Sequence, residues 1–236
     1  DTLSHSESVF FVGCLAAALV HVHRMGFVHR DIKPENCLIG KDGFLKLCDF
    51  GMAKRLPSTI LLPKGGTEVV TLAFTMCGTP EFMAPEYILS TGYDKGVDWW
   101  ALGCLLVEMC TGRSPFEFNG DLKATFKEVC LIGMGRKKYN PPDNIKKPGM
   151  ELVCSLIEGL LSPASARLGR DDDLEVVRHA YFATLDFNEM RTKNVTPPYV
   201  PRISHLTDTS HFRTFEYDVE ESVAPYEGDS EWCHDF

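Results

Sequence analysis

The stretch HRDIKPEN, residues 29–36, decides the fold of this chain. It lies in a predicted loop between two short strand-like segments, 27–28 and 37–39. A loop on a rigid scaffold can present several side chains to one point. This loop presents Asp31, Lys33 and Asn36 together, and DFG follows at 49–51, directly behind another apolar segment.

These residue types suit phosphoryl transfer from a nucleotide. That reaction needs a carboxylate for the proton of the acceptor hydroxyl, oxygen ligands for Mg²⁺, and a cation that offsets the charge of the transferring group. Asp31 is the first kind of group, Asn36 and Asp49 are the second, and Lys33 is the third. The alternative is a set of unrelated polar loop residues. The further motif APE at 84–86 counts against that alternative.

Composition restricts the function classes. The chain has 236 residues, of which 44% are hydrophobic and 24% charged, as in soluble domains. Its net charge of −9 disfavours general binding to nucleic acid. The nine cysteines contain no C-x-x-C pair, which favours reduced thiols and a cytoplasmic protein. We expect no membrane span and no signal peptide.

Apolar periodicity predicts a mainly α fold, with a small β-hairpin region and an extended C-terminal tail. The hairpin loop is expected at 40–43 and a long loop at 52–83, while the proline-rich segment 196–201 breaks regular structure. Predicted helices are 8–24, 85–90, 95–111, 121–132, 149–160 and 173–181, and predicted strands are 27–28, 37–39 and 44–47.

With these motifs the chain resembles the eukaryotic protein kinases. The K-P-E-N form of the loop resembles serine/threonine kinases, and CGTPEFMAPE at 77–86 is similar to the signature of the AGC group. The resemblance implies an α+β protein-kinase fold, with 1–182 as the lower lobe of the catalytic domain and 183–236 as the tail of the group. It also implies ATP and Mg²⁺ as cofactors.

The resemblance carries roles over to matching positions. It makes Asp31 the catalytic base, Lys33 a contact of the γ-phosphate, and Asn36 and Asp49 the magnesium ligands. It places Glu35, Leu38, Cys48 and Phe212 at the ATP site. It places Glu35, Glu108, Met76, Thr79, Pro80 and Met83 at the protein substrate, with the two glutamates binding an arginine before the acceptor residue.

Thr75 matches the activation phosphosite of the AGC group, with Arg30 and Lys54 at the positions that receive the phosphate. Other hydroxyls in the segment, such as Thr67 and Thr71, are the alternative, and Thr79 is expected to bond Asp31 and Lys33 instead. Residues 56–70 make this segment longer than usual for the group, and their role stays open.

Several residues resemble structural positions of the family. Glu86 and Arg167 match a buried ion pair. Asp98 lies at a predicted helix N-terminus, where a carboxylate accepts orphan N–H groups, and it matches a residue that braces the catalytic loop, residues 29–36. His29 matches a packing residue beneath DFG. The remaining histidines show no spacing typical of metal ligands, so we expect them in the core or facing solvent.

The tail motifs DTSHF at 208–212 and WCHDF at 232–236 look most like cGMP-dependent kinases, with cAMP-dependent kinases close behind. Phe236 and Trp232 would dock on an upper lobe. The chain shows no glycine-rich loop and no V-A-I-K lysine. We therefore expect an upper lobe and cyclic-nucleotide-binding domains upstream, and no activity from residues 1–236 alone. A non-catalytic kinase-like scaffold and a small-molecule phosphotransferase are the rival hypotheses.

Overall fold

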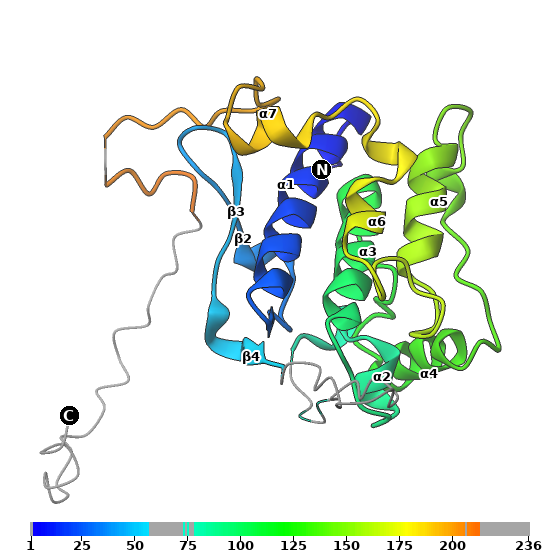
Figure 1. The fold of residues 1–236 in the computed structure, drawn as a ribbon. Helices are drawn as coiled ribbons and strands as arrows, with labels where there is room; N and C mark the ends of the chain where they lie inside the picture. Colours follow the sequence, from blue (N-terminus) through cyan, green and yellow to red (C-terminus); the bar gives the residue numbers. More distant parts are fainter. Residues whose placement is uncertain (1, 57–72, 74, 76–77, 206, 213–236) are drawn as a thin grey trace, which may run out of the picture. The chain divides into compact units, whose positions relative to one another are not determined.

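The structure is a computed structural model, and it describes residues 2–56, 73, 75, 78–205 and 207–212 (Figure 1). Contacts divide the chain into two units, Asp1–Pro201 and Arg202–Phe236. The described helices and strands all lie in the first unit, which is mostly helical with two small sheets. The predicted fold class is thereby confirmed.

Helix α1 (His5–Arg24) is a core helix of the first unit. It begins three residues before the predicted start because Ser4 and Glu7 form a capping box: the Ser4 hydroxyl accepts the Glu7 N–H at 3.3 Å, and the Glu7 carboxylate accepts the Ser4 N–H at 2.8 Å. Length and hydropathy alone would let α1 cross a membrane, but 67% of its most apolar window is buried inside the unit.

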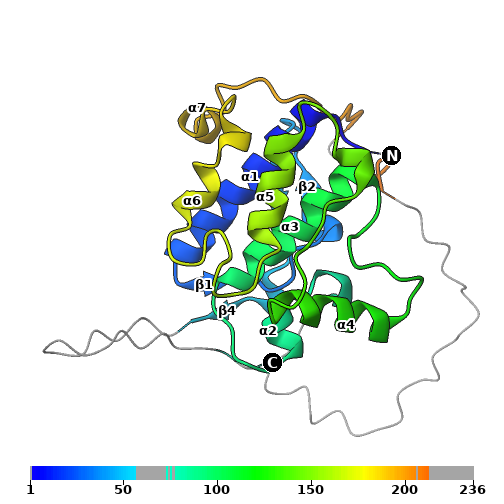
Figure 2. The same ribbon diagram turned by 90° about the vertical axis from the view of Figure 1, so that its right-hand side faces the viewer.

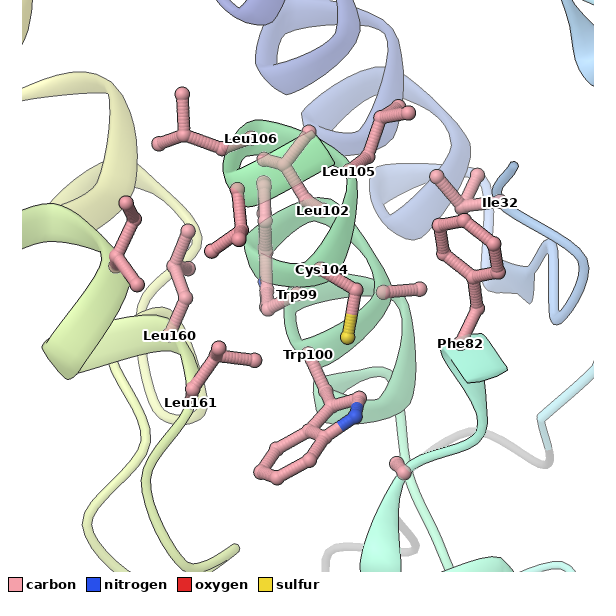
Figure 3. Packing of buried hydrophobic residues seen from close by; sticks show 14 of the residues in the cluster. Ile32, Phe82, Trp99, Trp100, Leu102, Cys104, Leu105, Leu106, Leu160 and Leu161 are labelled. Carbon is pink, nitrogen blue, oxygen red and sulfur yellow. The ribbon is translucent and has the colours of Figure 1, made fainter. Parts of the chain in front are cut away.

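Helix α3 (Gly96–Thr111) is the second core helix, and it lies between α1 and α5 (Glu151–Leu160) (Figure 1). In the turned view of Figure 2, α5 lies in front of α3. Gly103 permits the close approach of α5, because a Cβ at this position would come within 2.9 Å of the Leu160 Cβ. Figure 3 shows Trp99 and Trp100 of α3 with the side chains that pack on either side of this helix. Leu160 and Leu161 lie on one side, and Ile32 and Phe82 lie on the other.

The remaining helices are short apart from α4 (Leu122–Gly133). The predicted helix 173–181 is wrong in its extent: α6 ends at Val177, because the His179 ring accepts the Tyr181 N–H at 3.1 Å and starts a separate 3₁₀ turn. The other short helices are α2 (Pro85–Ile88), α6 (Leu174–Val177), α7 (Phe187–Arg191), η1 (Pro34–Asn36), η2 (Phe50–Met52), η3 (Pro80–Phe82), η4 (Asp143–Ile145) and η5 (Ala180–Phe182).

Two antiparallel strand pairs frame the catalytic loop. Strand β2 (Cys37–Ile39) pairs with β3 (Leu45–Leu47), as predicted, and Cys37 lies opposite Leu47. Strand β1 (Phe27–Val28) pairs with β4 (Lys54–Arg55), which the sequence did not predict. Strand β3 contacts α1, so the hairpin that carries the loop lies on a core helix (Figure 1).

The expected ion pair between Glu86 and Arg167 is present and buried. The two terminal guanidinium nitrogens bind both carboxylate oxygens, one of them at 2.9 Å, and one also donates to the Gly96 carbonyl at 3.0 Å. The guanidinium lies over the Trp100 ring, 5.1 Å from its centroid. The pair therefore joins α2 to the start of α3.

We predict that Arg167→Ala lowers the free energy of unfolding by about 3–5 kcal/mol, because it leaves the buried Glu86 carboxylate without its partner. Urea unfolding measures the loss. Lys138→Gln is the matched control, since Lys138 also pairs with a glutamate but its side chain is 78% exposed. The control should cost less than about 1 kcal/mol. A loss equally small for Arg167→Ala would contradict the prediction.

Candidate active site

The catalytic loop brings four of the predicted side chains together. The Lys33 ammonium lies 2.8 Å from one carboxylate oxygen of Asp31 and donates to the Thr79 hydroxyl at 3.3 Å. Thr79 donates to the other oxygen of Asp31 at 3.4 Å, and the Asn36 amide donates to Asp31 at 2.9 Å. The Asp31 carboxylate is thus held from three directions, and 8% of the residue is exposed.

The β2–β3 register places Asp49 beside this group. Asn36 precedes β2 and Cys48 follows β3, and the Cys48 N–H donates to the Asn36 carbonyl at 2.9 Å. Asp49 comes next and takes a left-handed backbone conformation, with φ of 58°. Its carboxylate accepts the Gly51 N–H at 3.1 Å and is otherwise exposed.

Asn36 and Asp49 fit a magnesium ion. The Asn36 amide nitrogen donates to Asp31, so its oxygen is left for a cation, and Asp49 offers an exposed carboxylate. Mg²⁺ takes oxygen ligands and usually keeps several waters, with only one or two protein groups. The described residues contain no cluster of three or more acidic, histidine or cysteine ligands.

His29 is fully buried beneath the DFG segment. Its Nε2 faces the Cys48 carbonyl at 3.0 Å, and its ring contacts Phe50 edge to face, with centroids 4.8 Å apart. The Asp31 N–H points at its Nδ1 at 3.4 Å. A carbonyl accepts and an N–H donates, so this geometry favours a proton on Nε2. His29 therefore links the catalytic loop to DFG by packing, as expected.

Asp98 braces the catalytic loop through the backbone. Its two oxygens accept the N–H groups of His29 and Arg30, each at 2.8 Å, and the side chain is fully buried. The donors come from the loop and not from the start of α3 itself, where Asp94 accepts the Gly96 N–H at 2.7 Å. The expected brace is present, but its partners are not the orphan amides of its own helix.

His23 is a further residue of the site, although the sequence predicts only a core or solvent-facing histidine. Its Nε2 lies 2.9 Å from Asp98, and its Nδ1 lies 3.1 Å from Asp173. Burial by itself would lower the His23 pKa, but the hydrogen bonds and charges of Asp173 and Asp98 outweigh it and raise the pKa to about 9. The signal in the sequence was its place on the buried face of the first helix.

The activation segment is described in part. The Lys54 ammonium donates to the exposed Thr75 hydroxyl at 3.3 Å. Arg30 instead donates to the Met52 carbonyl at 2.6 Å and to the Tyr93 hydroxyl at 2.7 Å. The structure therefore brings one of the two predicted phosphate receivers, Lys54, to Thr75.

The charges of three other glutamates, the acidic group of Glu108, act on this residue near the end of α3. Burial and the charges of Glu35, Glu81 and Glu117 raise the pKa of the Glu108 carboxyl. Glu35 is exposed. Four carboxylates that repel one another gain from a cation placed among them, and a guanidinium is the planar cation that binds carboxylates with two hydrogen bonds.

The other predicted residues differ in exposure and in the unit to which they belong. Leu38 is exposed, Pro80 and Cys48 are half-buried, and Met83 is buried. The Cys48 thiol donates to the Asn36 carbonyl at 3.3 Å. Phe212 is 62% exposed and belongs to the second unit. Met76, Trp232, Phe236 and residues 57–70 lie outside the described residues.

Comparisons with known proteins agree with this geometry. A family profile described as "Protein kinase domain" matches residues 1–182. The chain is 36% identical to cAMP-dependent protein kinase catalytic subunit 2 of Drosophila melanogaster, over 88% of this chain and 54% of that protein. It is 35% identical to cGMP-dependent protein kinase egl-4 of Caenorhabditis briggsae, over 89% of this chain and 26% of that protein. The chain thus spans about half the length of these curated relatives or less.

Proposed function

The chain belongs to the protein kinase domain family, and from this premise we propose that the protein transfers the γ-phosphoryl group of ATP to serine or threonine residues of other proteins. The convergence of Lys33, Asn36 and Thr79 on the Asp31 carboxylate supports this function most strongly. Relatives named as serine/threonine kinases, and as cAMP- and cGMP-dependent kinases, support an AGC-type enzyme.

In the proposed reaction, Asp31 orients the acceptor hydroxyl and takes its proton. Lys33 lies against Asp31 and Thr79, where its charge stabilises the transferring phosphoryl group. Asn36 and Asp49 would hold Mg²⁺, which when bound neutralises charge on the nucleotide phosphates. Leu38, Cys48 and Phe212 are proposed contacts of the nucleotide base, and Glu35 is a proposed contact of the nucleotide.

The finer assignment rests on the tail motifs. DTSHF and WCHDF favour a cGMP-dependent kinase over a cAMP-dependent one, whereas the sequence identities of 36% and 35% do not separate these two relatives. We therefore propose cyclic-nucleotide control. We also propose a cytoplasmic location, and a boundary between catalytic domain and tail at 182/183. Substrate proteins, an upper lobe and regulatory domains are the proposed partners.

Substitution of the proposed base tests the function. In the full-length protein, Asp31→Asn should lower kcat for peptide phosphorylation at least about a hundredfold, because the amide cannot accept the hydroxyl proton. Transfer of labelled phosphate from ATP measures this. Asp143→Asn removes the same charge from a fully exposed side chain and should leave kcat unchanged. Full-length protein that binds ATP but transfers no phosphate would favour the scaffold hypothesis instead.

The acidic group of Glu108 predicts basic substrates. Glu108→Gln should raise KM at least about tenfold for a peptide with arginine just before the acceptor, because one charged partner of the guanidinium is lost. The same substitution should leave KM unchanged for a peptide with alanine at that position. Peptide kinetics with both substrates measure the difference. Equal use of the arginine and alanine peptides by the unsubstituted protein would overturn the preference.

Thr75 is the proposed activation phosphosite. Phosphate there adds about −2 charge close to Lys54, which already donates to the hydroxyl. Full-length Thr75→Ala protein should therefore have a kcat about tenfold or more below that of the full-length protein phosphorylated on Thr75. Thr91→Ala, at another exposed threonine of the same unit, is the control. Mass spectrometry that finds Thr75 unmodified in fully active protein would contradict the proposal.

A further inference from the structure

The His23 imidazole lies between two carboxylates in the core. Asp98, from α3, faces Nε2 at 2.9 Å, and Asp173, just before α6, faces Nδ1 at 3.1 Å. Ionised carboxylates only accept hydrogen bonds, so both ring nitrogens must donate. The geometry therefore describes an imidazolium ion whose side chain is fully buried.

Asp173 is itself fixed from two further directions. The Trp99 indole donates to one of its oxygens at 2.9 Å, and the Lys95 ammonium lies 3.0 Å from the other. Lys95 lies just before α3, and Asp98 and Trp99 lie in its first turn. Together they are the charged and polar partners that this part of the chain provides to His23 and Asp173. The Asp173 side chain is 12% exposed, although it follows two exposed aspartates in the sequence.

The contacts form one continuous path to the catalytic loop. Asp173 holds His23, His23 holds the same Asp98 oxygen that accepts the His29 N–H, and the other Asp98 oxygen accepts the Arg30 N–H. Asp31 follows directly in the chain. A shift of the Asp98 carboxylate would therefore move the backbone that carries the proposed base.

We propose that Asp173 is a positioning residue of the active site, which acts through His23 and Asp98 to hold the backbone of the catalytic loop. The inference rests on the proposed function, because it assigns the path a role in phosphoryl transfer. It assigns Asp173 no contact with substrate or cofactor. A misplacement of about 1 Å can lower the rate of an enzyme about a hundredfold, so a remote carboxylate can still set kcat.

Protonation of His23 makes the path dependent on pH. The His23 pKa of about 9 in the folded protein lies above its ordinary value of 6.5. The stabilising contribution of the imidazolium is therefore complete below pH 6.5 and is lost as the pH rises through about 9. Without the Asp173 charge, burial is opposed only by Asp98, so the His23 pKa falls and the ring loses its proton at a lower pH.

The experiment compares Asp173→Asn with Asp171→Asn in the full-length protein. Both remove one negative charge, but the Asp171 side chain is 88% exposed. Asp173→Asn should lower kcat about tenfold or more, leave KM for the peptide within about twofold, and shift the alkaline fall of kcat to lower pH. Asp171→Asn should leave kcat and its pH profile unchanged. Loss of kcat in both variants, or in neither, would overturn the proposal.

A second measurement does not depend on activity. NMR titration of the unsubstituted protein should show the His23 ring losing a proton near pH 9, and the His29 and Arg30 amides losing protection from hydrogen exchange over the same range. A ring that titrates near 6.5, or amides that keep their protection, would overturn the path even if Asp173→Asn fails to fold. If the unsubstituted protein transfers no phosphate, the proposed function fails, and this titration still decides whether the path exists.

Discussion

The hydrogen bonds of the buried Asp98 carboxylate are the interaction on which the rest of the candidate site depends. This carboxylate accepts two backbone N–H groups of the catalytic loop and the ring of His23. A buried charge without such donors would cost several kcal/mol, so these hydrogen bonds stabilise the loop in this conformation. The loop also contains Arg30 with φ of 71°, a conformation that non-glycine residues seldom adopt. The Asp98 hydrogen bond to the Arg30 N–H holds the backbone there.

Two buried helices and a hairpin give the loop its frame. Helix α3 supplies Asp98 from the core and ends near the acidic group of Glu108, while α1 supports the β2–β3 hairpin. The hairpin register then sets Asn36 opposite Cys48 and places Asp49 beside it. Asp31 and Asn36 are buried and held by hydrogen bonds, which fixes their positions. Asp49 and Glu35 are exposed, so ligands can reach them.

Much of this could be predicted from the sequence, and the failures have physical reasons. The helices around residues 8–24, 95–111 and 121–132 show clear apolar periodicity, and HRDIKPEN gathers its polar groups within eight residues. Strand β4 has two residues, too few for any period, and α6 ends early because of one histidine side chain. Asp173 was missed because it stands in a run of three aspartates that reads as a solvated surface. Which of the three turns inward depends on partners from other elements, Lys95, Trp99 and His23.

The brace of the catalytic loop has a consequence for biosynthesis. Asp98 lies 69 residues after His29, and Asp173 lies 150 residues after His23. A ribosome therefore releases the loop long before it releases the carboxylates that order it. Contacts so distant in sequence form late, and a nascent chain that ends between them exposes the apolar face of α1 without a partner. The catalytic loop therefore cannot gain its Asp98 hydrogen bonds until the chain has been made at least as far as α3.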